Sequence, residues 1–340
     1  MAFLSFLIRR LGLSVFVFVG VLILTFIVSR VIPSNPAALY AGARPRPDQV
    51  AAIEKKLGLD KPLVEQFRVY VGDLLGGDLG ESYHSRRSIN TDLRIFLPAT
   101  LELVIAAVVI ALVLGIPIGV LAGAYPRSAF DYATRFVAVA GVSVPSFWLA
   151  LIAQFIFFSQ LGWLPLGSRI SRDASLFYPV ALQTGFFLID AAISGNWQAW
   201  LDALHHLILP ALVLSAYPVG VTIRMTQASM LEVLSETYVT AARAAGLSQR
   251  VILFKLALKN AIMPTLTVVG LSFAYSITGA FLVETIFSWP GVGKYVTEAV
   301  LNVDFPVIIA VTLVVTVVYI LVNLLVDLTQ AFVDPRVRLA

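Results

Sequence analysis

The sequence contains no cysteine and little charge, and both features restrict what the protein can be. With no cysteine among 340 residues, a disulfide framework, a thiolate metal site and a cysteine nucleophile are all excluded. Charged residues make up only 13% of the chain, 59% is hydrophobic, and the mean hydropathy is +0.89. Because ordinary globular domains are far more polar, this composition predicts a polytopic membrane protein.

Six long apolar segments alternate with polar ones. The first, residues 11–29, has no charge, and as a helix it would span about 28 Å of a hydrocarbon core about 30 Å thick. A signal peptide is the alternative, because Arg9-Arg10 resembles a charged leader and residues 41–43 a cleavage site, but the apolar run favours a retained anchor. We therefore expect an all-α fold with six transmembrane helices, the other five at residues 97–124, 136–160, 207–223, 265–283 and 306–326.

Signatures of catalysis or of an internal energy source are missing. No ionisable residue lies near the middle of an expected span, which argues against an ion-coupled secondary transporter and leaves it as the less favoured alternative. His205 and His206 are adjacent and so point to different sides, which favours a structural role over a metal site. Gly293-Lys294 lacks the other residues of a phosphate-binding loop. We therefore expect no catalytic residue, no metal site and no cofactor bound by this chain.

The orientation follows from the basic residues. With the amino terminus inside, 11 Lys and Arg fall on the cytoplasmic side and 13 outside, but ten of these 13 lie between Arg30 and Arg94. Because segments longer than about 60 residues obey the positive-inside rule poorly, that segment is set aside, and the count becomes 11 against 3. Both termini and the loop 224–264 are therefore expected in the cytoplasm.

The loop 224–264 is the longest polar interruption with basic residues throughout. Ser235 is a plausible N-cap of a short helix, and Gly246 sits where a left-handed C-terminal cap would go. A second helical start follows at Ser248. The short helix is rich in alanine, and small side chains allow a partner surface to approach its backbone closely. A connector helix lying on the bilayer is the alternative.

The motifs of this loop resemble those of ABC-transporter permease subunits. Thr240-Ala241-Ala242 followed by Gly246 is similar to the family's Glu-Ala-Ala-x-x-x-Gly motif, with threonine in place of the acidic residue. A longer pattern is similar to the dipeptide and oligopeptide branch: Tyr238, Val239, Ala242, Ala244, Gly246, Leu247, Ala257, Leu258, Lys259, Asn260, Ala261 and Pro264. Further segments resemble that branch: residues 77–82, 144–148, 284–294, 304–306 and 334–336. The segment 77–82 resembles a signature of the branch's B-type subunit.

The resemblance implies a type I ABC importer fold with three parts: residues 1–31 with the first helix, an outer subdomain at 32–96, and a permease domain at 97–340. It implies a bacterial inner-membrane permease subunit, not an enzyme, that forms half of a pathway for di- and oligopeptides. The same architecture in this branch also carries nickel complexes, glutathione and oligosaccharides, which stay open as alternatives.

The resemblance also implies the partners and the sites. The partners are a second homologous permease subunit, two ATPase subunits that bind the ATP and magnesium, an outer solute-binding protein and the lipid bilayer, with no nucleic acid. The ATPase-docking residues are those of the coupling helix: Glu236, Tyr238, Thr240, Ala241, Ala242, Arg243, Ala245 and Gly246. Candidate pathway residues are Phe147, Trp148 and Gln154.

Overall fold

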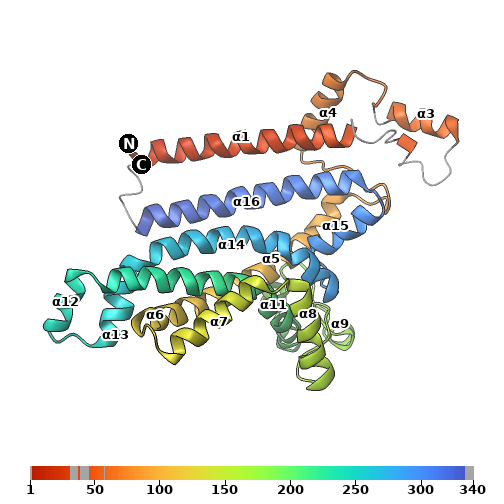
Figure 1. Ribbon diagram of the computed structural model, residues 1–340. Helices are drawn as coiled ribbons and strands as arrows, with labels where there is room; N and C mark the ends of the chain where they lie inside the picture. Colours follow the sequence, from red (N-terminus) through yellow and green to blue (C-terminus); the bar gives the residue numbers. More distant parts are fainter. Residues whose placement is uncertain (1, 31–36, 39–45, 57, 334–340) are drawn as a thin grey trace. The chain divides into compact units, whose positions relative to one another are not determined.

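The computed structural model describes residues 2–30, 37–38, 46–56 and 58–333, so the expected tail motif at residues 334–336 lies outside it. Apart from an isolated bridge between Glu81 and Ser88, regular structure in the described residues is helical (Figure 1). The α-helices are α1 (Ala2–Arg30), α3 (Pro47–Lys56), α4 (Leu63–Leu75), α5 (Ile89–Ile110), α6 (Ile116–Ala124), α7 (Ala129–Ser143), α8 (Ser146–Ala153), α9 (Arg172–Phe177), α10 (Phe187–Ile193), α11 (Trp197–Leu234), α12 (Thr237–Ala244), α13 (Gln249–Val251), α14 (Leu258–Ile286), α15 (Val292–Leu301) and α16 (Phe305–Val333). Three π-helical segments adjoin them: η1 (Ala111–Gly115), η2 (Gln154–Gln160) and η3 (Ile252–Ala257).

In the described residues, five helical stretches are long and apolar enough to cross a membrane, and a bent pair brings the number to six. The expected span 136–160 is that pair, because α7 and the helix that follows it meet at an angle of 108°. Val144 is extended there, and Pro145 begins the second arm. A proline lacks the amide that would continue the helix and forces the residue before it out of the helical region, so this span is bent.

The chain divides into two compact units. One consists of residues 3–97 and 294–320, and the other of residues 98–293 and 321–340, so that α5, α15 and α16 each contribute to both. In the first unit, α1, α4 and the start of α16 share an apolar cluster around Leu22, Ile309 and Leu313. The turn after Gly80 is fixed to α16, because the Asp304 carboxylate accepts hydrogen bonds from Ser82 Oγ and from two backbone amides.

In the second unit, α11 is the central helix. It packs against α14, α6 and α7, and Figure 1 shows α11 and α14 side by side. Its contact with η1 and α6 depends on a glycine every fourth residue. A Cβ atom added at any of these glycines would lie within 2.8 Å of a side-chain atom on α11, so the two backbones approach as only glycine permits. The pairs are Gly115 with Thr222, Gly119 with Thr226 and Gly123 with Met230.

The central helix is much longer than the expected span 207–223. It has 38 residues, about 57 Å at 1.5 Å per residue, which exceeds the thickness of a hydrocarbon core. Pro210 and Pro218 lie within it without ending it. The first turns therefore come from the segment between the expected spans 136–160 and 207–223, and the last turns carry the helix eleven residues into the loop 224–264. This extension determines where the short helix α12 begins.

Candidate docking helix and membrane cavity

The short helix α12 stands at one end of the second unit, between the ends of α11 and α14 (Figure 1). Ser235 closes α11 instead of starting α12: its backbone amide and its hydroxyl both bond to Glu232 O. The expectation that Ser235 is the N-cap is therefore wrong, and the N-cap residue is Glu236, in an extended conformation. The second start, at Ser248, is confirmed, because Ser248 is the N-cap of α13.

The end of α12 is fixed by glycine. Gly246 has a φ of +77°, as expected for a left-handed cap. Its amide donates to Arg243 O at 3.0 Å, and the amide of Leu247 donates to Ala242 O at 3.2 Å. These two bonds form a Schellman motif, which satisfies carbonyls at the helix end and turns the chain sharply back toward α13. A residue with a Cβ would be strained at position 246.

The two faces of α12 differ in what they contact. Val239 and Ala242 are buried and form a small apolar cluster with Ile252, against which Leu234 and Leu256 pack. The opposite face is exposed and carries small side chains at helical spacing: Thr237, Thr240, Ala241 and Ala244. The inner face thus holds α12 to its own chain, while the outer face offers close access to the helix backbone.

A hydrogen bond also attaches α12 to the start of the next long helix. Asn260 Nδ2 on α14 donates to the hydroxyl of Tyr238 at 2.8 Å. Together with the apolar cluster, this bond holds the short helix to its own chain at two points. The link joins residues 22 positions apart.

The eight residues expected to dock the ATPase differ in their exposure. Seven are exposed: Glu236, Tyr238, Thr240, Ala241, Arg243, Ala245 and Gly246. Ala242 is 9% exposed and belongs to the inner cluster, where it can position the helix but offers little surface to a partner. Ala244, which the expected set omitted, is exposed beside Thr240 and Ala241. The alternation of buried and exposed positions along the helix is the signal that could have separated them.

A cavity lies within the second unit, near the bend between α7 and α8. Its volume is about 240 Å³, and its walls come from α7, α8, α11 and α14. The rings of Tyr217 and Tyr275 lie 5.6 Å apart on its wall, and Ser146 and Ser276 add hydroxyls. None of the residues that line it carries a charge.

The expected pathway residues are near cavity-lining residues in the sequence, but they do not line the cavity themselves. Phe147 and Trp148 are 44% and 51% exposed on α8, between two residues, Ser146 and Leu149, that do line the cavity. Gln154 Nε2 donates to Leu166 O at 2.7 Å and to Ile286 O at 3.2 Å, so its side chain connects three segments of the unit. Sequence reasoning passed over Tyr217 and Tyr275, although a tyrosine in the middle of an apolar span is itself a signal.

Polar contacts in the second unit hold later segments to α5, among them the segment 284–294 noted in the sequence. Glu102 and Arg169 form a buried ion pair at 2.7 Å, and Glu102 also accepts from the amide of Leu188. Glu284 is fully buried, and Thr100 donates to its carboxylate at 2.6 Å. Gly291 packs directly against that carboxylate, and a Cβ there would lie 2.3 Å from it. The bonds of Thr100 to Glu284 and to the amide of Val292 hold the segment 284–293 against α5, and Glu102 holds Arg169 and Leu188 to the same helix.

The fold and the site together define a class: a multi-pass helical membrane protein with a short helix exposed at one end of its bundle. Two family models match the chain, one over residues 115–339, described as "Binding-protein-dependent transport system inner membrane component", and its N-terminal companion over residues 3–104. The chain belongs to this family of permease subunits.

Several relatives match over nearly the whole chain. The dipeptide transport system permease protein DppB of Alkalihalophilus pseudofirmus is 42% identical over 98% of this chain and 99% of its own length. The di/tripeptide permease protein DppB of Pseudomonas aeruginosa is 44% identical over the same shares. The probable D,D-dipeptide permease protein DdpB of Escherichia coli is 43% identical over 99% of this chain and 98% of its own length.

Proposed function

We propose that this chain forms half of the membrane pathway of an ATP-driven importer for short peptides. The observation that carries the proposal is α12: a short helix held to its own chain on one face and open, with small side chains, on the other. The relatives named for dipeptide and di/tripeptide transport support peptides as the substrate class.

In this proposal both termini and α12 face the cytoplasm, where two ATPase subunits bind the exposed face of the helix. A second permease subunit completes the pathway, and an outer solute-binding protein delivers the peptide. Closure of the ATPases on ATP pushes α12. The Tyr238–Asn260 bond and the inner cluster pass that displacement to α14 and α11, which carry the walls of the cavity.

The cavity between α7, α8, α11 and α14 is the proposed stretch of pathway. Its walls are uncharged and offer hydroxyls and ring faces. Such walls bond to a peptide backbone and contact side chains without discriminating by charge, so selection among peptides is left to the delivering protein. Phe147 and Trp148, beside the cavity on α8, stay proposed pathway residues. Gln154 stays one too, although its two hydrogen bonds go to backbone carbonyls of the same unit.

The test is ATP-driven uptake of a labelled dipeptide into vesicles that contain the complete importer. We expect Tyr217→Ala and Tyr275→Ala to reduce the uptake rate at least several-fold while the ATPase subunits still co-purify with the permease. Leu161→Ala, at an exposed residue of the same unit that does not line the cavity, is the control. Uptake that needs no ATP, or that both tyrosine variants leave unchanged, would contradict the proposal.

A further inference from the structure

A second and larger cavity lies in the first unit, whereas the proposed membrane pathway belongs to the second. Its volume is about 470 Å³, within the range of about 300–1,000 Å³ typical of small-molecule sites. The end of α1, helix α4, the turn at residues 78–83 and the first turns of α16 form its walls. It therefore combines the ends of two membrane spans with two extramembrane segments.

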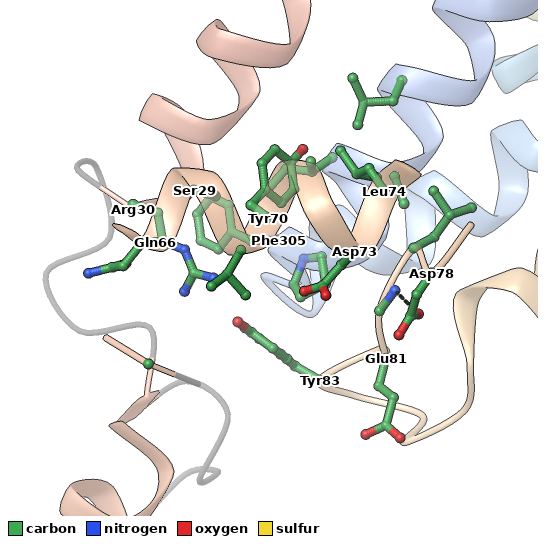
Figure 2. A pocket seen from close by; sticks show the side chains of 18 of the residues that line it. Ser29, Arg30, Gln66, Tyr70, Asp73, Leu74, Asp78, Glu81, Tyr83 and Phe305 are labelled. Carbon is green, nitrogen blue, oxygen red and sulfur yellow. Dashed lines mark hydrogen bonds between the residues drawn. The ribbon is translucent and has the colours of Figure 1, made fainter. Parts of the chain in front are cut away.

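Groups of opposite charge face this cavity from different sides. Figure 2 shows Arg30 on one side, Asp73 on the other, and the ring of Tyr83 directed into the space between them. Apolar residues supply part of the wall, among them Leu74, Phe305 and Ile309. Lys55, Lys61, Asp78 and Glu81 also line the wall, and the Asp78 carboxylate already accepts a hydrogen bond from the amide of Gly80 at 2.8 Å. The cavity thus offers charges of both signs and an apolar surface to the same bound molecule.

Two of the charged side chains in the wall are available to bind a ligand. Among the described residues, the side chains of Arg30 and Asp73 have no hydrogen-bonded or ion-paired partner, whereas Lys61, also in the wall, pairs with Glu65 at 2.8 Å. Gln66 closes part of the wall, held by bonds from its Nε2 to Leu59 O and Lys61 O. Its buried Oε1 has no partner in the described part of the chain, and packed structural walls rarely leave such a group unsatisfied.

We propose that this cavity binds the two ends of a short peptide, with Arg30 on the carboxylate and Asp73 on the ammonium. The inference rests on the proposed function and deepens it, because it gives the permease a peptide site of its own outside the membrane pathway. A simple anion would meet Asp73 and a simple cation would meet Arg30, so a zwitterion complements the cavity better than either. Binding is weak and brief, because Asp73 is exposed and water screens its charge.

The test measures equilibrium binding of radiolabelled Ala-Ala to the purified importer complex, with neither ATP nor the solute-binding protein present. N-acetylated Ala-Ala and Ala-Ala amide are compared with the free dipeptide. We expect saturable binding of the free dipeptide, and about tenfold weaker binding when either end is blocked, the loss of one charge-assisted hydrogen bond.

The variants assign each end of the peptide to one residue. Arg30→Gln should bind free and amidated Ala-Ala equally, and Arg30→Lys should restore the preference for the free carboxylate. Asp73→Asn should bind free and acetylated Ala-Ala equally. Arg68→Gln and Asp60→Asn, exposed charges outside the cavity wall, should keep both preferences.

Three results would overturn the inference: no saturable binding by the wild-type complex, equal binding of free and blocked peptides, or a co-purified ethanolamine phospholipid that Ala-Ala does not displace. That lipid has a phosphate and an ammonium, and so the same chemistry as the peptide ends. ATP-driven uptake is measured on the same preparations. Normal uptake with any of these three results removes only the cavity proposal, whereas absent uptake removes the proposed function.

Discussion

Tyr238 on the short helix α12 and Asn260 on the long helix α14 are joined by a 2.8 Å hydrogen bond, although α13 and η3 lie between them in the chain. Tyr238 is 39% exposed, so its ring lies partly on the outer surface while its hydroxyl is held from within the chain. The residue therefore belongs both to the surface available to a partner and to the attachment of α12. This dual position makes it a sensitive point for testing whether α12 transmits movement.

Removing that bond should weaken coupling more than folding. A hydrogen bond of this kind contributes about 0.5–1.5 kcal/mol, so Tyr238→Phe should leave the melting temperature nearly unchanged. We expect more ATP hydrolysed per peptide imported, and the same change in Asn260→Ala. Tyr178→Phe, at a comparable exposure of 43% in another segment, is the control. If the double variant is no worse than either single variant, the two residues act through one bond; additive losses would argue against it.

Adjacent alanines on α12 should respond differently to the same substitution. Ala241→Asp places a charge on the exposed face, so we expect it to prevent ATPase co-purification without lowering the melting temperature of the permease. Ala242→Asp buries a charge in the cluster with Val239 and Ile252, which should destabilise the attachment of α12. Limited proteolysis of the 235–250 region should show faster cleavage for Ala242→Asp only. Equal cleavage of both variants would mean that the helix has no distinct inner face.

Breaking the buried Glu102–Arg169 pair should be costly. Glu102→Gln leaves the Arg169 guanidinium buried without its counter-ion, and such changes cost about 3–5 kcal/mol. We expect a clear fall in the melting temperature in detergent. The double variant Glu102→Leu/Arg169→Met should recover part of it, because it removes both charges. Lys61→Gln breaks an exposed pair instead and should have little effect. A fall no larger than that of Lys61→Gln would show that the buried pair contributes little.

Asp190 should make stability depend on pH in the acid range. Burial by itself would raise the pKa of this carboxyl, but hydrogen bonds from Thr184 and from the amides of Gly185 and Gln183 outweigh it and hold the pKa below its ordinary value. The carboxylate therefore stabilises the fold at every pH above its unfolded-state pKa, about 4. This stabilisation is lost as the pH falls through the lower folded-state pKa.

The measurement for Asp190 is the difference in melting temperature between the wild type and Asp190→Asn. We expect the difference to be greatest near neutral pH and constant down to about pH 5, and to shrink below about pH 4. Asp173→Asn, which removes an exposed carboxylate on α9, serves as the comparison. A difference that grows as the pH falls would have the wrong sign and would rule out the hydrogen-bonded carboxylate as its source.

The sequence by itself determined the membrane class, the approximate positions of the spans and the place of the short helix. These properties are local: an uncharged run of about 20 residues spans a bilayer wherever it occurs, and a glycine after an alanine-rich stretch ends a helix. Gly246 was found in this way, and it does adopt a positive φ. Ser235 was misassigned because α11 continues past its expected end, held by the packing of its glycine-facing surface against α6.

Only the tertiary structure decided which face of each element is used. It placed Ala242 inside and Ala241 outside, although the two are neighbours in the same motif. It paired Glu102 with Arg169 across 67 positions, joined Thr100 to Glu284, and brought the ends of α1, α4 and α16 around one cavity. No local pattern encodes such pairs, because their energy comes from burial and geometry that exist only once distant helices have packed together.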